Sequence, residues 1–170
     1  LELAAEHGYA LVPPYDDPAV IAGTGTIGAE IAADLPDVDL VLVPVSGGGL
    51  ISGIATAVKI RCPQARVVGV EPELAADAAE SFRRGERVEW SPELTFRTAA
   101  DGLRVAGVGE LPWLHIQQYV DDIVTVTEDQ IRAAVRLLAR SARLVAEPSG
   151  AVATAAYLAH PSLAEHAGTA

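Results

Sequence analysis

The chain has 170 residues, of which 50% are hydrophobic, and a formal net charge of −11. This length suits one ordinary domain with a sizeable core. The acidic charge argues against nucleic acid as a partner, because phosphates require clustered Lys and Arg. The sequence contains no run of about eighteen uncharged apolar residues, so it predicts no membrane span. The single cysteine, Cys62, cannot form an internal disulfide, so we expect a cytoplasmic protein.

The first predicted element is a short strand at residues 10–12, which leads into a turn at residues 13–16. Asp17 then caps a helix that begins at Pro18, since Asp is favoured as an N-cap and Pro at the first helical position. This helix contains the Gly-x-Gly-x-x-Gly pattern at residues 23–28. In dinucleotide-binding proteins that pattern follows a strand. Because the preceding residues are helical in character, we interpret these glycines as allowing close helix packing.

Apolar runs and helical segments alternate along the rest of the chain. Residues 38–45 are a short, β-branched, nearly continuous apolar run, as expected of a strand buried on both faces. The other predicted elements are helices at 48–60, 74–84, 128–143 and 148–160 and strands at 66–70 and 122–126. Thr127 and Gln130 form a capping box, and residues 85–120 are interpreted as an irregular excursion that lines a site or a subunit contact. This alternation predicts an α/β fold with three layers, in which helices cover both faces of a mostly parallel, twisted sheet.

A second glycine motif, Ser46-Gly47-Gly48-Gly49-Leu50, joins the first buried strand to the helix after it. Consecutive glycines allow several backbone N–H groups to converge, and the N-terminus of the helix adds its positive end. The Ser46 hydroxyl is a further donor. A plain tight turn needs only one glycine, so this motif predicts a cradle for a phosphate dianion.

Five segments occur along the chain in a distinctive order. They are residues 17–26, the loop at 46–50, Gly69-Val70-Glu71-Pro72, Ala100-Asp101-Gly102 and Glu147-Pro148-Ser149-Gly150-Ala151. This ordered set resembles the threonine/serine dehydratase and serine racemase family of pyridoxal 5'-phosphate (PLP) enzymes and covers essentially the whole chain. The resemblance implies a fold type II PLP enzyme with two unequal domains, of which this chain is the larger part of the cofactor domain.

The resemblance also implies the residues that contact the cofactor. The phosphate would be bound by Ser46, Gly47, Gly48, Gly49 and Leu50. Glu147 would lie near the cofactor ring. The alternative for Glu147 is a structural role as the cap of the helix that begins at the next residue.

A divalent cation, Mg²⁺ or Ca²⁺, is a further implication of the resemblance. Its matching ligands are the carboxylates of Glu71 and Asp77 and the carbonyl oxygen of Ala75. Hard oxygen ligands of this kind suit both ions. The residues alone favour another interpretation, in which Glu71 ends a strand and Asp77 lies on a solvated helix face.

The chemistry of such enzymes needs a lysine amine, which bonds to the cofactor and later moves the substrate's α-proton. Lys59 is the only lysine of this chain, and it lies about three helical turns from the glycine loop. We interpret it as a solvated helix residue that points away from the cofactor. In the family the lysine belongs to an N-terminal portion without a counterpart here, and a final strand is absent too. We therefore expect residues 1–170 to be a partial PLP-binding domain without a catalytic residue, inactive by itself.

The resemblance implies a PLP-dependent dehydratase that eliminates water and ammonia from threonine, serine or another small β-hydroxy amino acid, or a closely related serine racemase. Two alternatives remain open. One is a β-replacement enzyme or threonine synthase of the same fold, and the other is a non-catalytic domain that binds a phosphorylated small molecule. The full-length protein is expected to be a homodimer.

Overall fold

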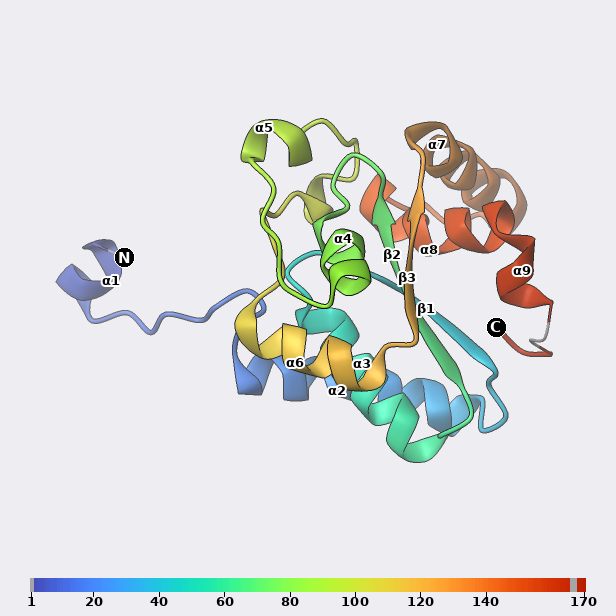
Figure 1. Ribbon diagram of the computed structural model, residues 1–170, viewed down its shortest axis with the longest axis horizontal. Coiled ribbons are helices and arrows are strands. Elements are labelled where there is room, and N and C mark those ends of the chain that lie inside the picture. The colour runs from blue at the N-terminus through green and yellow to red at the C-terminus, as the bar shows by residue number, and fades with distance from the viewer. Residues whose placement is uncertain (1, 166–167) are drawn as a thin grey trace.

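The computed structural model describes residues 2–165 and 168–170, and a parallel sheet lies at its centre (Figure 1). The strands are β1 (Leu40–Pro44), β2 (Arg66–Pro72) and β3 (Asp122–Val126), in the order β1-β2-β3. Both pairings are parallel: Val43 lies opposite Gly69, and Gly69 lies opposite Ile123. The carboxyl ends of the three strands therefore meet at one edge of the sheet.

Helices cover both faces of this sheet, as the sequence predicts (Figure 1). One face is covered by α2 (Pro18–Asp34), α3 (Gly49–Arg61), α4 (Asp77–Arg84) and α6 (Glu110–Tyr119), and the other by α7 (Glu128–Leu137) and α8 (Pro148–Ala159). Side chains alternate along the strands, so Val67 and Ile123 belong to the first core while Val68 and Val126 belong to the second. None of the helices that the structure describes is long and apolar enough to cross a membrane.

Two helix caps form where the sequence predicts them. The Asp17 carboxylate accepts the backbone N–H of Ala19 at 2.7 Å at the start of α2. Thr127 and Gln130 make the reciprocal capping box at the start of α7, directly after β3. The predicted helix there continues beyond α7 as a π-helical turn, η2 (Leu138–Ala142).

The predicted strand at residues 10–12 is wrong. The chain instead begins with a short helix, α1 (Glu2–His7), and an extended arm that stands away from the body of the molecule (Figure 1). Leu11 and Val12 are 64% and 75% exposed. No backbone hydrogen bond joins residues 10–12 to any other described segment, and a strand without a neighbour has no ladder to stabilise it.

The segment from residue 85 to residue 120 is more regular than the sequence predicts. It contains a short helix α5 (Pro92–Thr95), a 3₁₀ turn η1 (Asp101–Leu103) and the whole of α6. The sequence does not predict α6, because a proline such as Pro112 ordinarily breaks a helix. Pro112 lies in the first turn of α6, where backbone N–H groups lack intrahelical partners, so its missing N–H removes no helical hydrogen bond. A last short helix, α9 (Pro161–Ala164), comes after α8.

Helices α2 and α3 approach each other closely at Gly28, which confirms the packing interpretation of the Gly-x-Gly-x-x-Gly pattern for its last glycine. A Cβ atom at Gly28 would lie 2.6 Å from a backbone carbonyl oxygen of α3. On the facing helix, a Cβ at Gly53 would overlap the hydroxyl of Thr24 and the backbone of α2. At Gly23, by contrast, an added Cβ would meet no neighbouring atom within 4 Å.

Alanine substitutions at two of these glycines should have opposite effects on stability. Gly53→Ala should lower the free energy of unfolding by about 1–3 kcal/mol, because the methyl group forces the two backbones apart. Gly23→Ala should raise it by up to about 1 kcal/mol, because alanine favours the helix and meets open space. Urea unfolding followed by circular dichroism measures both changes. Equal changes in the two variants would contradict a packing role for Gly53.

Candidate functional site

The glycine loop lies at the carboxyl end of β1 and opens α3, so the sheet presents it at the edge where ligands of α/β folds bind. Gly48 has a φ of 89°, in the left-handed region. A Cβ atom there would also lie 2.8 Å from Cβ of Pro112. Only glycine satisfies both conditions at this position.

Backbone N–H groups of this loop have no hydrogen-bond partner in the part of the chain that the structure describes. Within residues 2–165 and 168–170, no atom accepts a hydrogen bond from the N–H of Gly47, Gly48, Gly49 or Leu50. The three glycines are buried, and the N-terminus of α3 adds its partial positive charge. Buried donors without acceptors are costly, so this loop is suited to bind an anion.

The tyrosine that covers the loop is not evident from the sequence. The ring of Tyr15 lies against Gly47 and occupies the space that a side chain would fill. In the sequence Tyr15 stands out only as part of a turn. The three glycines predict only that something approaches the loop closely, and the sequence does not indicate that it is this ring.

A cavity of about 380 Å³ opens at the loop. Besides residues 46–50, its walls include Pro14, Tyr15, Pro44, Gly102, Leu103 and Val105. The backbone N–H of Gly102 donates to Oγ of Ser149 at 2.9 Å, which ties this wall to the first turn of α8. Two of the five sequence segments, which contain Gly48 and Gly102, therefore line one cavity, and a third segment is joined to its wall through Ser149.

Glu147 lies directly before α8 at its N-cap position, but its side chain makes no capping hydrogen bond. The capping interpretation of Glu147 is therefore wrong. Its carboxylate is exposed, two residues from the serine that holds Gly102. The side chain is thus free to contact a ligand at this edge.

Lys59 lies at the opposite edge of the sheet. Its Nζ donates to the carbonyl of Ala65 at 2.8 Å and forms an ion pair with Asp121 at 2.7 Å. Asp121 in turn accepts the N–H of Val67, so the lysine ties together the amino ends of β2 and β3. Lys59 points away from the glycine loop, as predicted, but it is not a solvated residue. Its side chain is only 20% exposed because Asp121 holds it against the sheet.

Two carboxylates are buried together at the carboxyl end of β2. Glu71 is 1% exposed, and it accepts the N–H groups of Ala78 and Ala79 at the start of α4, at 3.1 and 2.7 Å. Asp77 is 0% exposed, and neither of its carboxylate oxygens has a partner among the described residues. The interpretation that placed Asp77 on a solvated helix face is therefore wrong.

This burial changes the acidity of both groups. Burial raises the pKa of Asp77 to about 7. For Glu71, burial and then the charge of Asp77 raise the pKa well above its ordinary value, although hydrogen bonds from Ala79 and Ala78 oppose the rise. Two buried carboxyls that disfavour each other's charge are stabilised by any cation that reaches them.

The oxygen atoms in this turn fit a hard cation. The carbonyl of Ala75, which is also buried, accepts no hydrogen bond from a described residue, and the oxygens of Asp77 are unpartnered. Together with Glu71 they offer the carboxylate and carbonyl ligands that Mg²⁺ and Ca²⁺ prefer. The described residues contain no cluster of three or more His, Cys, Asp or Glu side chains placed to hold a metal. A cation here would therefore depend on two carboxylates, a carbonyl and water.

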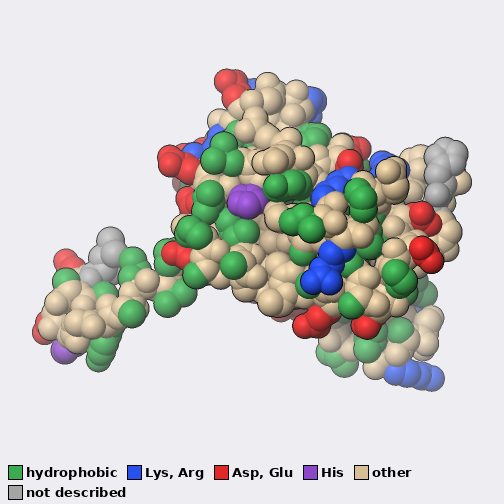
Figure 2. Space-filling model, turned by 90° about the horizontal axis from the view of Figure 1, so that it is seen from below, with side chains coloured by type: hydrophobic (Ala, Val, Ile, Leu, Met, Phe, Trp, Pro, Cys, Tyr) green, Lys and Arg blue, Asp and Glu red, His purple; other side chains and the backbone are tan. Residues whose placement is uncertain are grey.

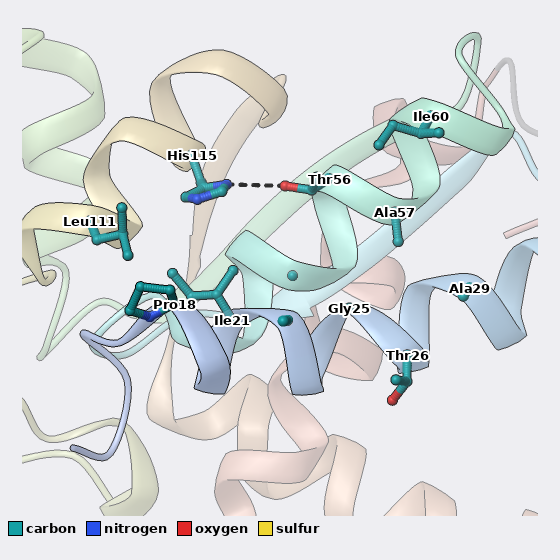
Figure 3. Close-up of a pocket in the computed structure, with 12 residues that line it drawn as sticks. Pro18, Ile21, Gly25, Thr26, Ala29, Thr56, Ala57, Ile60, Leu111 and His115 are labelled. Atoms are coloured by element: carbon teal, nitrogen blue, oxygen red, sulfur yellow. Dashed lines mark hydrogen bonds between the residues drawn. The ribbon is translucent and has the colours of Figure 1, made fainter. Parts of the chain in front are cut away.

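A larger cavity, of about 590 Å³, lies between α2, α3 and α6 and contains none of the glycine-loop residues (Figure 3). Its walls are mainly apolar, and Thr56 Oγ1 and Nδ1 of His115 form a hydrogen bond of 3.1 Å across it. Figure 2 shows the molecule from the side of these helices, with exposed hydrophobic side chains scattered over the face. This cavity lacks converging donors, so the loop cavity is the better candidate for chemistry.

Nearly all of the chain matches a known family. The model of the pyridoxal-phosphate dependent enzyme family matches residues 1–168. The chain belongs to this family.

Relatives within the family include lyases and racemases. The L-threonine ammonia-lyase of Thermotoga maritima is 46% identical over 160 residues, which cover 93% of this chain and 39% of that protein. The crystal structure of a threonine deaminase from T.th. has a TM-score of 0.90 and 44% identity, covering 95% of this chain and 58% of its own. The structure of maize serine racemase has a TM-score of 0.90 and 34% identity, and the match covers 97% of this chain and 49% of the racemase chain. This chain thus spans less than two thirds of each relative.

Proposed function

We propose that the protein carrying this chain is a PLP-dependent ammonia-lyase, which removes water and ammonia from L-threonine or L-serine. In this proposal the chain supplies the phosphate-binding part of the cofactor domain. The observation that carries it is the row of unpartnered N–H groups at residues 47–50 of the glycine loop, in a chain of this family. The likeness to the ammonia-lyase of Thermotoga maritima supports the reaction.

A serine racemase is the second candidate, since the maize enzyme matches this fold with the same TM-score as the threonine deaminase. Both reactions begin when the substrate's α-proton is removed, and they differ in their later steps. The choice depends on which groups protonate or release the substrate, so the phosphate loop alone favours neither reaction.

Different residues of this chain would bind different parts of the cofactor. The backbone N–H groups of residues 47–50, from Gly47 to Leu50, and the Ser46 hydroxyl would bind the phosphate, and Glu147 would lie near the ring. When bound, PLP supplies an electron sink that accommodates the negative charge left by proton removal. Lys59 is held at the far edge of the sheet, so this chain contributes binding and orientation rather than the amine.

A divalent cation is the second part of the proposal. Mg²⁺ or Ca²⁺ would be held by Glu71, Asp77 and the carbonyl of Ala75. Its effect would be structural, because it would neutralise the buried carboxylate pair and fix the turn between β2 and α4. The unpartnered oxygens of Asp77 are the observation in its favour.

We also propose that the protein is cytoplasmic. Cys62 is a buried free thiol whose Sγ lies 3.4 Å from the carbonyl of Pro36, which suits a reducing cytoplasm. The homodimer rests on the family resemblance alone.

The purified chain should bind PLP more tightly than pyridoxal, which lacks the phosphate. Gly48→Ala should lower the affinity for PLP by at least about tenfold, because the added methyl group would collide with Pro112 and displace the loop. Titration followed by the absorbance of PLP measures these dissociation constants. Gly23→Ala, in open space on α2, is the matched control and should bind as the unchanged chain does. Equal affinities for PLP and pyridoxal would refute the phosphate assignment.

The reaction is tested on the protein that carries this chain. With PLP present, it should release ammonia from L-threonine and L-serine, which a coupled ammonia assay follows. Formation of D-serine without ammonia would instead support the racemase. If neither product forms although PLP is bound, a β-replacement enzyme or a binding protein becomes the better interpretation.

The cation should be visible in the stability of the chain. In EDTA, the unfolding temperature should fall as the pH rises from about 4 to about 7. The sign follows because the pKa of Asp77 is about 7 in the folded chain and lower in the unfolded one. The folded state therefore binds more protons in this window and loses stability as they leave. Added Ca²⁺ or Mg²⁺ should raise the unfolding temperature at pH 8.

The variant Asp77→Asn distinguishes stabilisation by a cation bound at Asp77 from a general effect of added salt. This variant should be more stable than the unchanged chain in EDTA at pH 8 and should no longer respond to the cation. Asp37→Asn, at an exposed position, should leave the response intact. An unchanged cation response in Asp77→Asn would show that the cation binds elsewhere.

A further inference from the structure

Asp16 joins two segments that lie 94 residues apart in the chain. Its Oδ2 accepts the backbone N–H of Glu110 and its Oδ1 accepts that of Leu111, both at 3.0 Å. These are the first two N–H groups of α6, which have no partners inside the helix. A carboxylate at the positive N-terminus of a helix is favourable, and Gly109, at the N-cap position, has no side chain to supply one. Asp16 therefore holds the first turn of α6 from a distant part of the chain.

The first turn of α6 in turn holds the glycine loop. The N–H of Gly109 donates to the carbonyl oxygen of Gly47 at 3.0 Å. A trans peptide directs its carbonyl and its N–H to opposite sides, so the N–H of Gly48 points away from α6. The residues that line the cavity at the loop include none from α6. The hydrogen bond from Gly109 thus turns one of the loop's free donors away from the helix.

Close contacts leave this arrangement little freedom to shift. A Cβ atom at Gly109 would lie 2.7 Å from Cγ of Asp16, so the carboxylate reaches the helix only because residue 109 is a glycine. On the other side of Asp16, a Cβ at Gly49 would lie 2.9 Å from Cα of Tyr15. The turn that carries Tyr15 and Asp16 therefore touches the loop directly and also holds the helix behind it.

We propose that Asp16 is a positioning residue for the phosphate loop. By capping α6 it sets the hydrogen bond between Gly109 and Gly47, and through that bond the direction of the Gly48 donor. The inference rests on the proposed function of the loop, because it assigns Asp16 an effect on phosphate binding without contact with the phosphate. The adjacent residue, Asp17, caps α2 instead, so two neighbouring aspartates hold two different helices.

The test compares Asp16→Asn and Asp16→Ala with Asp17→Asn in the purified chain. Asparagine keeps the shape of the side chain but offers one acceptor oxygen, so one N–H group of α6 loses its partner. Asp17→Asn makes the same chemical change one residue away, on the cap of α2. Dissociation constants for PLP and for pyridoxal are measured at a temperature at which circular dichroism shows every variant folded.

Asp16→Asn should lower the affinity for PLP about tenfold, and Asp16→Ala should lower it further. The affinity for pyridoxal should change less than about twofold in both variants. Asp17→Asn should leave both affinities within about twofold. In ¹H–¹⁵N spectra, the amide of Gly109 should exchange with solvent faster in the Asp16 variants only, since its bond to Gly47 is loosened.

Two results would overturn the inference. One is that Asp16→Asn binds PLP as tightly as the unchanged chain, and the other is that the Asp16 and Asp17 variants weaken PLP equally, since capping would then contribute stability alone. If the proposed function itself is wrong, a different measurement shows it: the unsubstituted chain would bind pyridoxal as tightly as PLP. The exchange rate of the Gly109 amide needs no ligand, so it tests the connection from Asp16 to the loop in either case.

Discussion

Buried backbone donors without acceptors are the constraint on which the rest of this structure depends. A loop that leaves the N–H groups of residues 47–50 unpaired forfeits hydrogen bonds that water would otherwise provide. The surrounding elements must therefore hold the loop in place. Tyr15 covers one side, α6 holds the second through Gly109, and the sheet and α3 fix its two ends. The closest of these contacts require glycine, which explains why three occur in succession.

The two edges of the sheet have opposite chemistry. At the carboxyl edge, β1 leads into backbone donors without acceptors among the described residues. Near the end of β2, Glu71 lies close to Asp77 of α4, whose carboxylate oxygens have no donor among those residues. One strand end thus suits an anion and its neighbour a cation, and the two sites remain separate because each has its own helix. At the amino edge, Lys59 and Asp121 neutralise each other and fasten the strands together. The carboxyl edge therefore carries both candidate binding sites, whereas the side chains at the amino edge hold the strands together.

Local patterns predicted most of the fold, and distant contacts account for what they missed. The capping box at Thr127, the β3 strand and the glycine loop are each contained in a few consecutive residues, so the sequence displays them directly. The strand expected at residues 10–12 failed because pairing requires a neighbour that composition does not reveal. The pairing of Lys59 spans 62 residues, and the burial of Asp77 depends on the packing of α4. Neither the pairing of Lys59 nor the burial of Asp77 can be predicted from the residues next to it in the sequence.

The hydrogen bonds from Asp16 to α6 also have a consequence for the order of folding. The unit of β1, the loop and α3 is continuous in sequence, so it can form early from local contacts. Its final geometry nevertheless depends on a helix 94 residues away from Asp16, so it cannot be completed by local contacts alone. A chain emerging from the ribosome would thus carry an unfinished loop until residue 111 had been made and docked. A phosphate ligand would then bind only after α6 has docked, and not as soon as β1 and α3 have formed.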